Sequence, residues 1–302
     1  MRFVVTLVGP GKGALTDTMI GAARKTLFAL GAEEISTDWL ADGEAVDLSF
    51  KEVDPDQADA AVRHALGDAQ IDCIAQPTEG RRKRLLVADM ESTIIEQEML
   101  DEIAELKGIK AEIAAITARA MNGEIDFVGA LTERVALIAG LPESAIDALA
   151  ARITLMPGAD ALVRTMRHHG ARTILVSGGF TIFAEQVASQ LGFDLVRANV
   201  LEFTGPPSAR ILAGTVAPPI RDRDDKLEQL RRQSARYHIP LAATLAVGDG
   251  ANDIPMLLAA GLGVAFRAKP TVRATARAHV DHAGLEALLF AQGYRADEIV
   301  RA

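Results

Sequence analysis

The sequence predicts an α/β protein: a doubly wound parallel sheet with an inserted helical cap, preceded by a small ferredoxin-like α+β domain. Three observations indicate this. Residues 1–80 alternate strand and helix patterns in the order βαββαβ, and the remainder alternates short apolar runs with amphipathic helices. A long, almost purely helical stretch interrupts that alternation. Strands that alternate with helices favour right-handed crossovers and an open sheet covered on both faces.

Residues 1–80 are expected to form their own domain. An apolar run at residues 3–8 ends at a Gly-Pro-Gly turn signal, and a helix-period pattern follows as far as Gly31. Two strand-like runs then flank Asp42 and Gly43, which together form a hairpin signal. A second helix and a last strand complete the βαββαβ order of a ferredoxin-like module.

Residues 85–302 are expected to form the second domain, after a basic linker at residues 81–84. The helical stretch is too long for one crossover, so we interpret about residues 98–156 as an inserted cap. Strands buried on both faces of a parallel sheet are apolar without alternation, and runs of this kind occur at residues 85–88, 173–176, 244–247 and 263–266. Helical patterns accompany them at residues 159–169, 182–191 and 225–237.

Composition and charge exclude several classes of function. The chain has 302 residues and a formal net charge of −9, which does not fit the basic surface that nucleic-acid binding requires. No stretch of the sequence is apolar for the length of a membrane span, and the single cysteine, Cys73, excludes an internal disulfide framework. We therefore expect a cytoplasmic protein that binds neither nucleic acid nor membranes.

Carboxylates follow two of the predicted strands at their carboxyl ends, where open α/β sheets bind their ligands. They are Asp89 and Glu91 after the first strand, and Asp249 and Asp253 after the third. A lone aspartate there can be a helix N-cap, but four carboxylates at one edge repel one another unless a cation lies among them. Oxygen ligands suit a hard ion, and Mg²⁺ is the usual choice beside phosphate.

A magnesium site of this kind suits phosphoryl transfer. A carboxylate beside Mg²⁺ can attack phosphorus, and Asp89 is best placed to do so. Glu91 is placed to protonate the leaving oxygen and then to activate water. After the second strand, Ser177 and the backbone N–H groups of Gly178 and Gly179 would hold phosphate oxygens.

The charge that develops in such a reaction requires a cation. Lys226, at the start of the helix before the third strand, is the candidate. From periodicity alone, a solvated helix lysine accounts for this position equally well.

These residues resemble the motifs of the phosphoserine phosphatases of the haloacid dehalogenase superfamily, from Leu85 to about Pro270. The superfamily's motifs correspond here to Asp-Met-Glu-Ser-Thr at 89–93, Ser-Gly-Gly-Phe at 177–180, Lys226, and Gly-Asp-Gly-Ala-Asn-Asp at 248–253. The resemblance implies that Asp89 is the nucleophile. It also implies that Asp89, Asp249 and the backbone carbonyl of Glu91 ligate Mg²⁺, that Asn252 and Asp253 support the metal site, and that Asn252 touches the substrate.

The cap carries residues that resemble the substrate-binding set of these phosphatases. Glu98 matches the glutamate that meets the substrate ammonium, and Arg134 matches the arginine that holds its carboxylate. Met121 and Phe127 match the apolar residues that close over the ligand. One fixed anion and one bidentate cation are what a zwitterionic amino acid requires, although either charge alone could be a helix-surface residue.

Glu91 departs from the family pattern, which has an aspartate there. The side chain is one methylene longer, and a misplacement of about an ångström can cost about a hundredfold in rate. Either the local conformation compensates and the chain is an ordinary hydrolase, or the phosphoenzyme persists and another hydroxyl accepts the phosphoryl group. Superfamily members that transfer phosphoryl to homoserine also have Glu at this position but differ in the following residues, so we favour hydrolysis.

The N-terminal module resembles the ACT-like domains that precede the catalytic domain in some phosphoserine phosphatases. This resemblance implies an amino-acid effector or a homodimer, and pure dimerisation without a ligand is equally compatible with the sequence. The Gly-Pro-Gly turn at residues 9–11 is where a ligand pocket would be sought.

The sequence thus predicts a phosphatase that hydrolyses O-phospho-L-serine to L-serine and phosphate through a phosphoaspartate, the last step of serine biosynthesis. Two alternatives stay open. One is a phosphoserine-dependent phosphotransferase or a phosphatase for another small phosphomonoester. The other is a non-catalytic regulator that binds amino acids, against which the intact Asp89, Lys226 and Asp249 argue.

Overall fold

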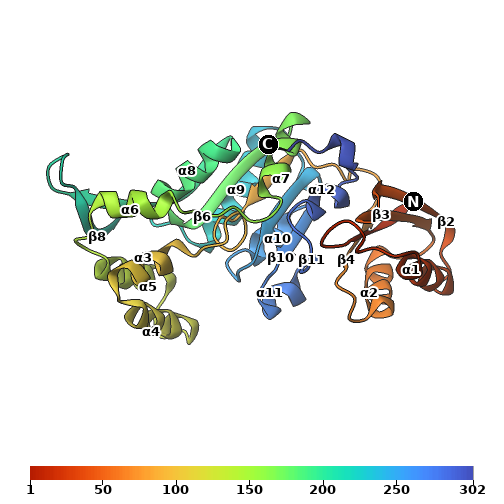
Figure 1. Ribbon diagram of the computed structural model, residues 1–302, viewed down its shortest axis with the longest axis horizontal. Coiled ribbons are helices and arrows are strands. Elements are labelled where there is room, and N and C mark those ends of the chain that lie inside the picture. Colours follow the sequence, from red (N-terminus) through yellow and green to blue (C-terminus); the bar gives the residue numbers. More distant parts are fainter. Residues whose placement is uncertain (302) are drawn as a thin grey trace.

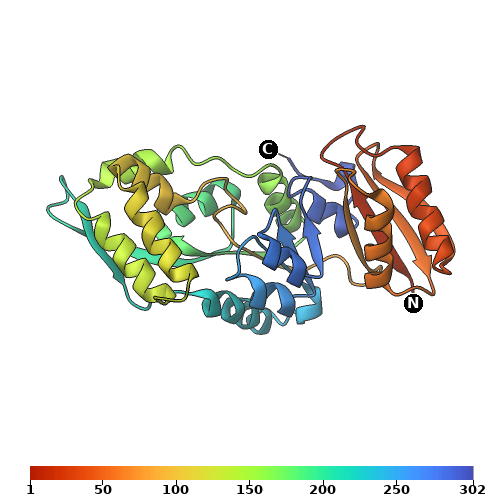
Figure 2. The ribbon, with the colours of Figure 1, turned by 90° about the horizontal axis from the view of Figure 1, so that it is seen from below.

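The computed structural model describes residues 1–301, and the side chain of Met121, predicted to close over the ligand, lies outside the described part. The molecule is elongated. An N-terminal module (residues 1–80) lies at one end, a central sheet in the middle, and the cap helices with the β7–β8 hairpin at the other end (Figures 1 and 2).

The N-terminal module is an antiparallel sheet in the order β2-β3-β1-β4, with two helices packed on it. The side chains of Thr16 and Asp54 accept hydrogen bonds from the first turns of α1 and α2 and so fix where these helices begin. The predicted ferredoxin-like order is confirmed. The elements are β1 (Phe3–Val8), α1 (Asp17–Ala29), β2 (Glu33–Ala41), β3 (Ala45–Lys51), α2 (Pro55–Leu66) and β4 (Asp72–Pro77).

The central sheet has the order β11-β10-β9-β5-β6-β7-β8 and is parallel except for the antiparallel pair β7–β8. Leu86 and Ala88 of β5 face one apolar cluster, and Leu85 and Val87 face another, so both faces of the strand are buried as predicted. The strands are β5 (Leu85–Ala88), β6 (Arg172–Phe180), β7 (Leu195–Thr204), β8 (Ile211–Ala217), β9 (Thr244–Gly248), β10 (Leu262–Phe266) and β11 (Ala278–Val280).

Helices cover both faces of this sheet, which confirms the doubly wound α/β fold. Helices α7, α8 and α12 contribute to one apolar cluster, and α9, α10 and α11 to the other. Within residues 1–301, every helix is too short or too polar to reach across a lipid bilayer. Their bounds are α7 (Ala159–His168), α8 (Thr181–Leu191), α9 (Arg223–Arg236), α10 (Ile254–Ala259), α11 (Pro270–Thr275) and α12 (Ala287–Ala291), with 3₁₀ turns at Leu241–Ala243 and Ala296–Glu298.

The inserted helices lie between β5 and α7: α3 (Met99–Lys107), α4 (Lys110–Met121), α5 (Phe127–Leu137) and α6 (Glu143–Ala150). We call residues 94–97 and 152–158 the first and second cap linkers. The linkers pair with each other, because Ile95 and Leu155 form an antiparallel bridge. The far side of the cap contacts the β7–β8 hairpin, where Gly140 N–H donates to the Leu212 carbonyl at 2.8 Å.

Strands β7, β8 and β11 were not predicted. Residues 195–217 mix polar and apolar positions, because the β7–β8 hairpin extends beyond the helix layers and is partly exposed. Strand β11 has three residues, too few for a periodic signal.

Candidate active site

The site begins with Asp89, the residue directly after β5. Its N–H donates to the Val247 carbonyl at 3.0 Å, which ties the ends of β5 and β9 together. Lys226 Nζ lies 2.8 Å from Asp89 Oδ1 and 2.7 Å from Asp253 Oδ1. Lys226 is 1% exposed, so the solvated-helix reading of this lysine is wrong and the structure brings it into the carboxylate cluster.

Three carboxylates converge beside this lysine. Asp89, Asp249 and Asp253 each offer an oxygen, and these oxygens all lie within 4.8 Å of one another. Burial and then the charge of Asp89 raise the pKa of Asp249 to about 6. Burial opposes the charge of Lys226, but the adjacent carboxylates outweigh it and raise the pKa of this lysine. One lysine does not balance three carboxylates, so the cluster fits a divalent cation.

Asp253 also holds the loop that carries Asp249. Its Oδ2 accepts from the Gly250 N–H at 3.0 Å. A Cβ at Gly248 would collide with the Asp253 carboxylate, so the loop requires glycine there. The glycines of the Gly-Asp-Gly sequence thus let the backbone wrap around one buried acid while it presents the other.

The carboxyl group of Glu91 contacts the cap. Its Oε1 accepts from the N–H of Met99, the first residue of α3, at 2.9 Å. A Cβ at Gly179 would lie 2.7 Å from Oε2, so the second motif accommodates the longer side chain because position 179 lacks one. Burial, followed by the charge of Glu98, raises the pKa of Glu91 to about 8. A carboxyl that keeps its proton at neutral pH can donate it to a leaving oxygen.

The Ser-Gly-Gly-Phe motif at residues 177–180 is held by a residue that the sequence did not predict, Asn199. Ser177 Oγ accepts from the Gly179 N–H at 2.9 Å. Asn199 Nδ2 donates to the Gly178 carbonyl at 2.8 Å, and its Oδ1 accepts from the Arg221 N–H at 2.7 Å. Asn199 lies inside β7 and is 1% exposed, so nothing in its local sequence marks it.

Of the predicted cap residues, Glu98, Phe127 and Arg134 meet the sheet residues in one cavity of about 200 Å³. Phe127 lies above Gly178, since a Cβ there would be 3.6 Å from the ring. Glu98 accepts from Ser92 Oγ at 2.6 Å, and Arg134 Nε donates to the Ala130 carbonyl at 3.2 Å. The cavity is lined by Asp89, Glu91, Glu98, Leu100, Phe127, Leu131, Arg134, Gly178, Gly179, Phe180, Asp249, Gly250, Asn252 and Lys269. Ser177, Lys226 and Asp253 are buried behind this lining.

A wider cavity of about 620 Å³ adjoins the first and shares Phe127, Arg134 and Asn252 with it. Its other wall includes Asp222 and Asp224 at the start of α9. The shared residues thus line both spaces.

Lys269 lines the inner cavity and was not predicted. Its N–H donates to the Asp249 carbonyl at 3.3 Å, and its charge opposes the upward pKa shift of Asp249. Lys269 follows β10, so the rule that located the other site residues at the carboxyl ends of strands would also have found it.

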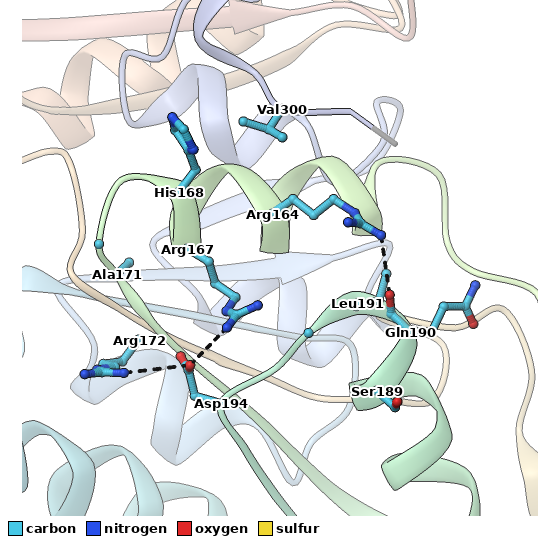
Figure 3. A pocket seen from close by; sticks show the side chains of 12 residues that line it. Arg164, Arg167, His168, Ala171, Arg172, Ser189, Gln190, Leu191, Asp194 and Val300 are labelled. Atoms are coloured by element: carbon cyan, nitrogen blue, oxygen red, sulfur yellow. Dashed lines mark hydrogen bonds and ion pairs between the residues drawn. The ribbon is translucent and has the colours of Figure 1, made fainter.

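Another cavity of about 620 Å³ lies at the opposite ends of the strands (Figure 3). Arg167 and Arg172 approach Asp194 at 3.5 and 3.8 Å, and Arg164 donates to the Gln190 carbonyl at 3.5 Å. Positive charge is stabilising at the carboxyl-terminal ends of helices, and α7 and α8 both end here. These arginines therefore have a structural role.

Comparison with known proteins identifies the family. Residues 86–258, more than half of the chain, match the family described as haloacid dehalogenase-like hydrolase. The phosphoserine phosphatase SerB2 of Mycobacterium tuberculosis is 46% identical over 222 residues, which cover 74% of this chain and 53% of the relative. A phosphoserine phosphatase of Streptomyces coelicolor is 41% identical over 255 residues, which cover 84% of this chain and 61% of the relative.

A crystal structure of a probable phosphoserine phosphatase from Vibrio cholerae superimposes with a TM-score of 0.78 at 29% identity. The match covers 98% of this chain and 88% of that one. The chain thus spans a little over half of the length of the two relatives named above, while it matches the solved structure over most of both lengths.

Proposed function

Since the chain belongs to the haloacid dehalogenase-like hydrolases, we propose that it hydrolyses O-phospho-L-serine to L-serine and phosphate through a phosphoaspartate on Asp89. One observation carries this proposal: a single small cavity has phosphoryl-transfer groups on its sheet wall and a carboxylate and a guanidinium, Glu98 and Arg134, on its cap wall.

The nucleophile in this proposal is a carboxylate oxygen of Asp89. As the bond from Asp89 to phosphorus forms, the bond from phosphorus to the serine oxygen breaks. Glu91 gives its proton to that oxygen, and afterwards takes a proton from the water that cleaves the acyl phosphate. The buried charge of Lys226 and the N–H groups of the second motif would stabilise the phosphoryl oxygens.

We propose Mg²⁺ as the cation, held by Asp89, Asp249 and the carbonyl of Glu91, with Asp253 and Asn252 in support. Carboxylate and carbonyl oxygens are the ligands that Mg²⁺ prefers. When bound, the ion would polarise the phosphoryl group and offset its repulsion by Asp89. The 4.8 Å grouping of the three aspartates supports this assignment.

The cap residues supply the proposed choice of substrate. Glu98 would meet the ammonium group and Arg134 the carboxylate, with Phe127 and Met121 covering the ligand. Asn252, which lines both cavities, would contact the substrate as well. The inner volume of about 200 Å³ lies below the roughly 300–1,000 Å³ of drug-sized sites, which favours a small phosphomonoester.

Phosphate release decides between hydrolysis and transfer. The full chain is assayed with L-phosphoserine and Mg²⁺, with EDTA, and with homoserine as an acceptor. We expect steady release of phosphate that requires the metal and that homoserine does not divert. Asp89→Asn should abolish it, because an amide oxygen is a poor nucleophile. Release that survives in this variant would refute the nucleophile, and phosphohomoserine as the product would replace hydrolysis by phosphotransfer.

The remaining proposals concern the rest of the chain. We propose that residues 1–80 form a regulatory or dimerisation unit of ACT type, and that residues 85–302 with the cap at about 98–156 form the catalytic unit. We also propose an amino-acid effector, a homodimer and a cytoplasmic place in serine biosynthesis, which the proposed activity and the ferredoxin-like order of residues 1–80 support. Calorimetric titration with L-serine and sedimentation of the full chain test the effector and the dimer.

A further inference from the structure

One buried carboxylate of the N-terminal module bonds to the backbone of the central domain. Asp72, the first residue of β4, is 0% exposed. It accepts from three successive backbone N–H groups that follow β11: Asp281 at 2.7 Å, His282 at 3.2 Å and Ala283 at 2.8 Å. A carboxylate accepts such bonds strongly, and the loss of one acceptor leaves a buried N–H without a partner.

The 281–285 loop is also held by side chains of both modules. Asp281 pairs with Arg273 at 3.0 Å and with His279 at 2.9 Å. Arg63, on α2 of the N-terminal module, contacts the same histidine at 3.4 Å. The N-terminal module therefore holds this loop through Asp72 and through the contact of Arg63 with His279.

The other end of this loop contacts the second cap linker. The Leu285 N–H donates to the Pro157 carbonyl at 2.8 Å. A Cβ at Gly284 would lie 2.7 Å from that carbonyl oxygen, and a Cβ at Gly158 would lie 2.9 Å from the Leu285 nitrogen. The loop and the linker thus pass one another at backbone contact, with glycine on each side.

Arg267 also stabilises the contact between the 281–285 loop and the second cap linker. Its guanidinium donates to the Ala283 carbonyl at 3.3 Å and reaches Met156 Sδ at 3.6 Å. One side chain at the end of β10 therefore touches both the loop and the second cap linker.

The second cap linker continues the series of contacts to the nucleophile. The Met156 N–H donates to the Ile94 carbonyl at 2.9 Å, and the Ile94 N–H donates to the Met90 carbonyl at 2.8 Å. Met90 directly follows Asp89, and its N–H donates to Asp89 Oδ1 at 2.8 Å.

We propose that Asp72 is a positioning residue for the cap: through the 281–285 loop it holds the second cap linker where the cap closes over the site. This inference rests on the proposed function for its kinetic consequence, but the structural coupling itself does not. The N–H groups of the loop are held by the N-terminal module, so a change at β4 reaches the second cap linker without any contact with substrate.

The expected effect on substrate binding follows from which residues the closed cap brings together. Glu98 and Arg134 lie on the cap side of the cavity, while the residues proposed to transfer the phosphoryl group lie on the sheet. A looser second cap linker lowers the fraction of molecules with the cap closed, and apparent affinity falls in proportion to that fraction. Weakened binding should therefore appear with a zwitterionic phosphoester and much less with one that the cap does not hold.

Two variants weaken this series of contacts at two places, one at Asp72 in the N-terminal module and one at Gly284 beside the second cap linker. Asp72→Asn keeps the shape of the side chain but turns an NH₂ group toward N–H donors, so an acceptor is lost. Gly284→Ala leaves Asp72 intact and pushes against the Pro157 carbonyl. Asp47→Asn is the matched control, because Asp47 is a buried aspartate of the same module whose partners are Thr6 and Arg81.

Hydrogen–deuterium exchange of the full chain reads the coupling without substrate. Peptides that cover residues 94–99 and 152–158 should exchange faster in Asp72→Asn and in Gly284→Ala than in the wild type, and Asp47→Asn should match the wild type there. Unchanged exchange in both test variants would overturn the inference. Equal acceleration in Asp47→Asn would reduce the role of Asp72 to general stability and overturn it as well.

Kinetics read the consequence. KM for L-phosphoserine should rise about two- to thirtyfold in both test variants, the range that couplings of this kind span. KM for p-nitrophenyl phosphate should stay within about twofold, since Glu98 and Arg134 do not hold that ester. A parallel rise for both substrates contradicts the cap mechanism. If the wild type does not hydrolyse phosphoserine at all, the proposed function fails, while the exchange result still decides the coupling.

Discussion

The two ends of the central sheet differ in how their charged side chains are paired. At the carboxyl ends, Asp89, Asp249 and Asp253 crowd together around one lysine. At the other ends, the arginines of the cavity in Figure 3 each have an acidic or carbonyl partner. The smaller cavity is the one with uncompensated charge. A functional site is therefore better recognised by charges that the fold leaves unbalanced than by volume.

The largest expected effect comes from removing the lysine at the crowded end. Lys226→Met leaves two buried carboxylates facing each other, so the free energy of unfolding should fall by about 3–5 kcal/mol and phosphatase activity should be lost. Urea denaturation in EDTA measures the first, and phosphate release the second. Lys110→Met, at an exposed helix position, is the control. A Lys226→Met protein as stable as the control would show that the carboxylates do not depend on this cation.

A smaller effect is expected from the glycine that accommodates Glu91. The added methyl group of Gly179→Ala would sit 2.7 Å from Glu91 Oε2 and displace the carboxyl group. A shift of about an ångström can cost about a hundredfold, so kcat should fall by that order. Gly21→Ala in α1, where an added methyl group meets open space, should leave kcat unchanged. An unchanged kcat in Gly179→Ala would contradict the proposed role of Glu91 in the proton transfers.

The third prediction separates recognition from chemistry at the same end. Arg134→Ala should raise KM for phosphoserine about ten- to a hundredfold, the size of one lost charged hydrogen-bonding partner, with a smaller change in kcat. The exposed Arg119, which pairs with Glu133 on the cap, supplies the matched variant Arg119→Ala. Equal increases of KM for phosphoserine and for p-nitrophenyl phosphate would refute the contact with the substrate carboxylate.

The smallest effect is expected at the opposite end of the sheet. Arg167→Ala removes a half-exposed partner of Asp194, so stability should fall by no more than about 1 kcal/mol and kcat/KM should be unchanged. A tenfold loss of kcat/KM in this variant would mean that the arginine cavity contributes to catalysis, and the contrast between the two ends would no longer hold.

The sequence predicted the residues that chemistry confines to one type. Asp89, Ser177 and Asp249 lie where the carboxyl ends of buried strands place them, because parallel strands bring their ends to one edge. Lys226 lies in α9, and its burial, which periodicity left open, depends on how that helix packs on the sheet. Asn199 could not be predicted, since it acts across the fold on a carbonyl of the second motif from the interior of a strand.

The reach of Glu91 and the role of Asp72 were beyond the sequence for a related reason. The departure at Glu91 was visible, but its partner, the N–H of Met99, depends on how the cap sits on the sheet. Asp72 contacts backbone groups more than two hundred residues away, and a backbone N–H has no sequence signature. Periodicity and motifs carry the least information about contacts between a side chain and a main-chain group in another part of the fold.

The bridge between Ile95 and Leu155 places the entry and exit of the cap side by side. An insert with adjoining ends can be lengthened, shortened or exchanged while the chain on either side keeps its path. The sheet can then keep the proposed phosphoryl-transfer chemistry while different caps present different side chains to the rest of the substrate. New specificities can therefore arise in evolution, or in the laboratory, by grafting at these two positions.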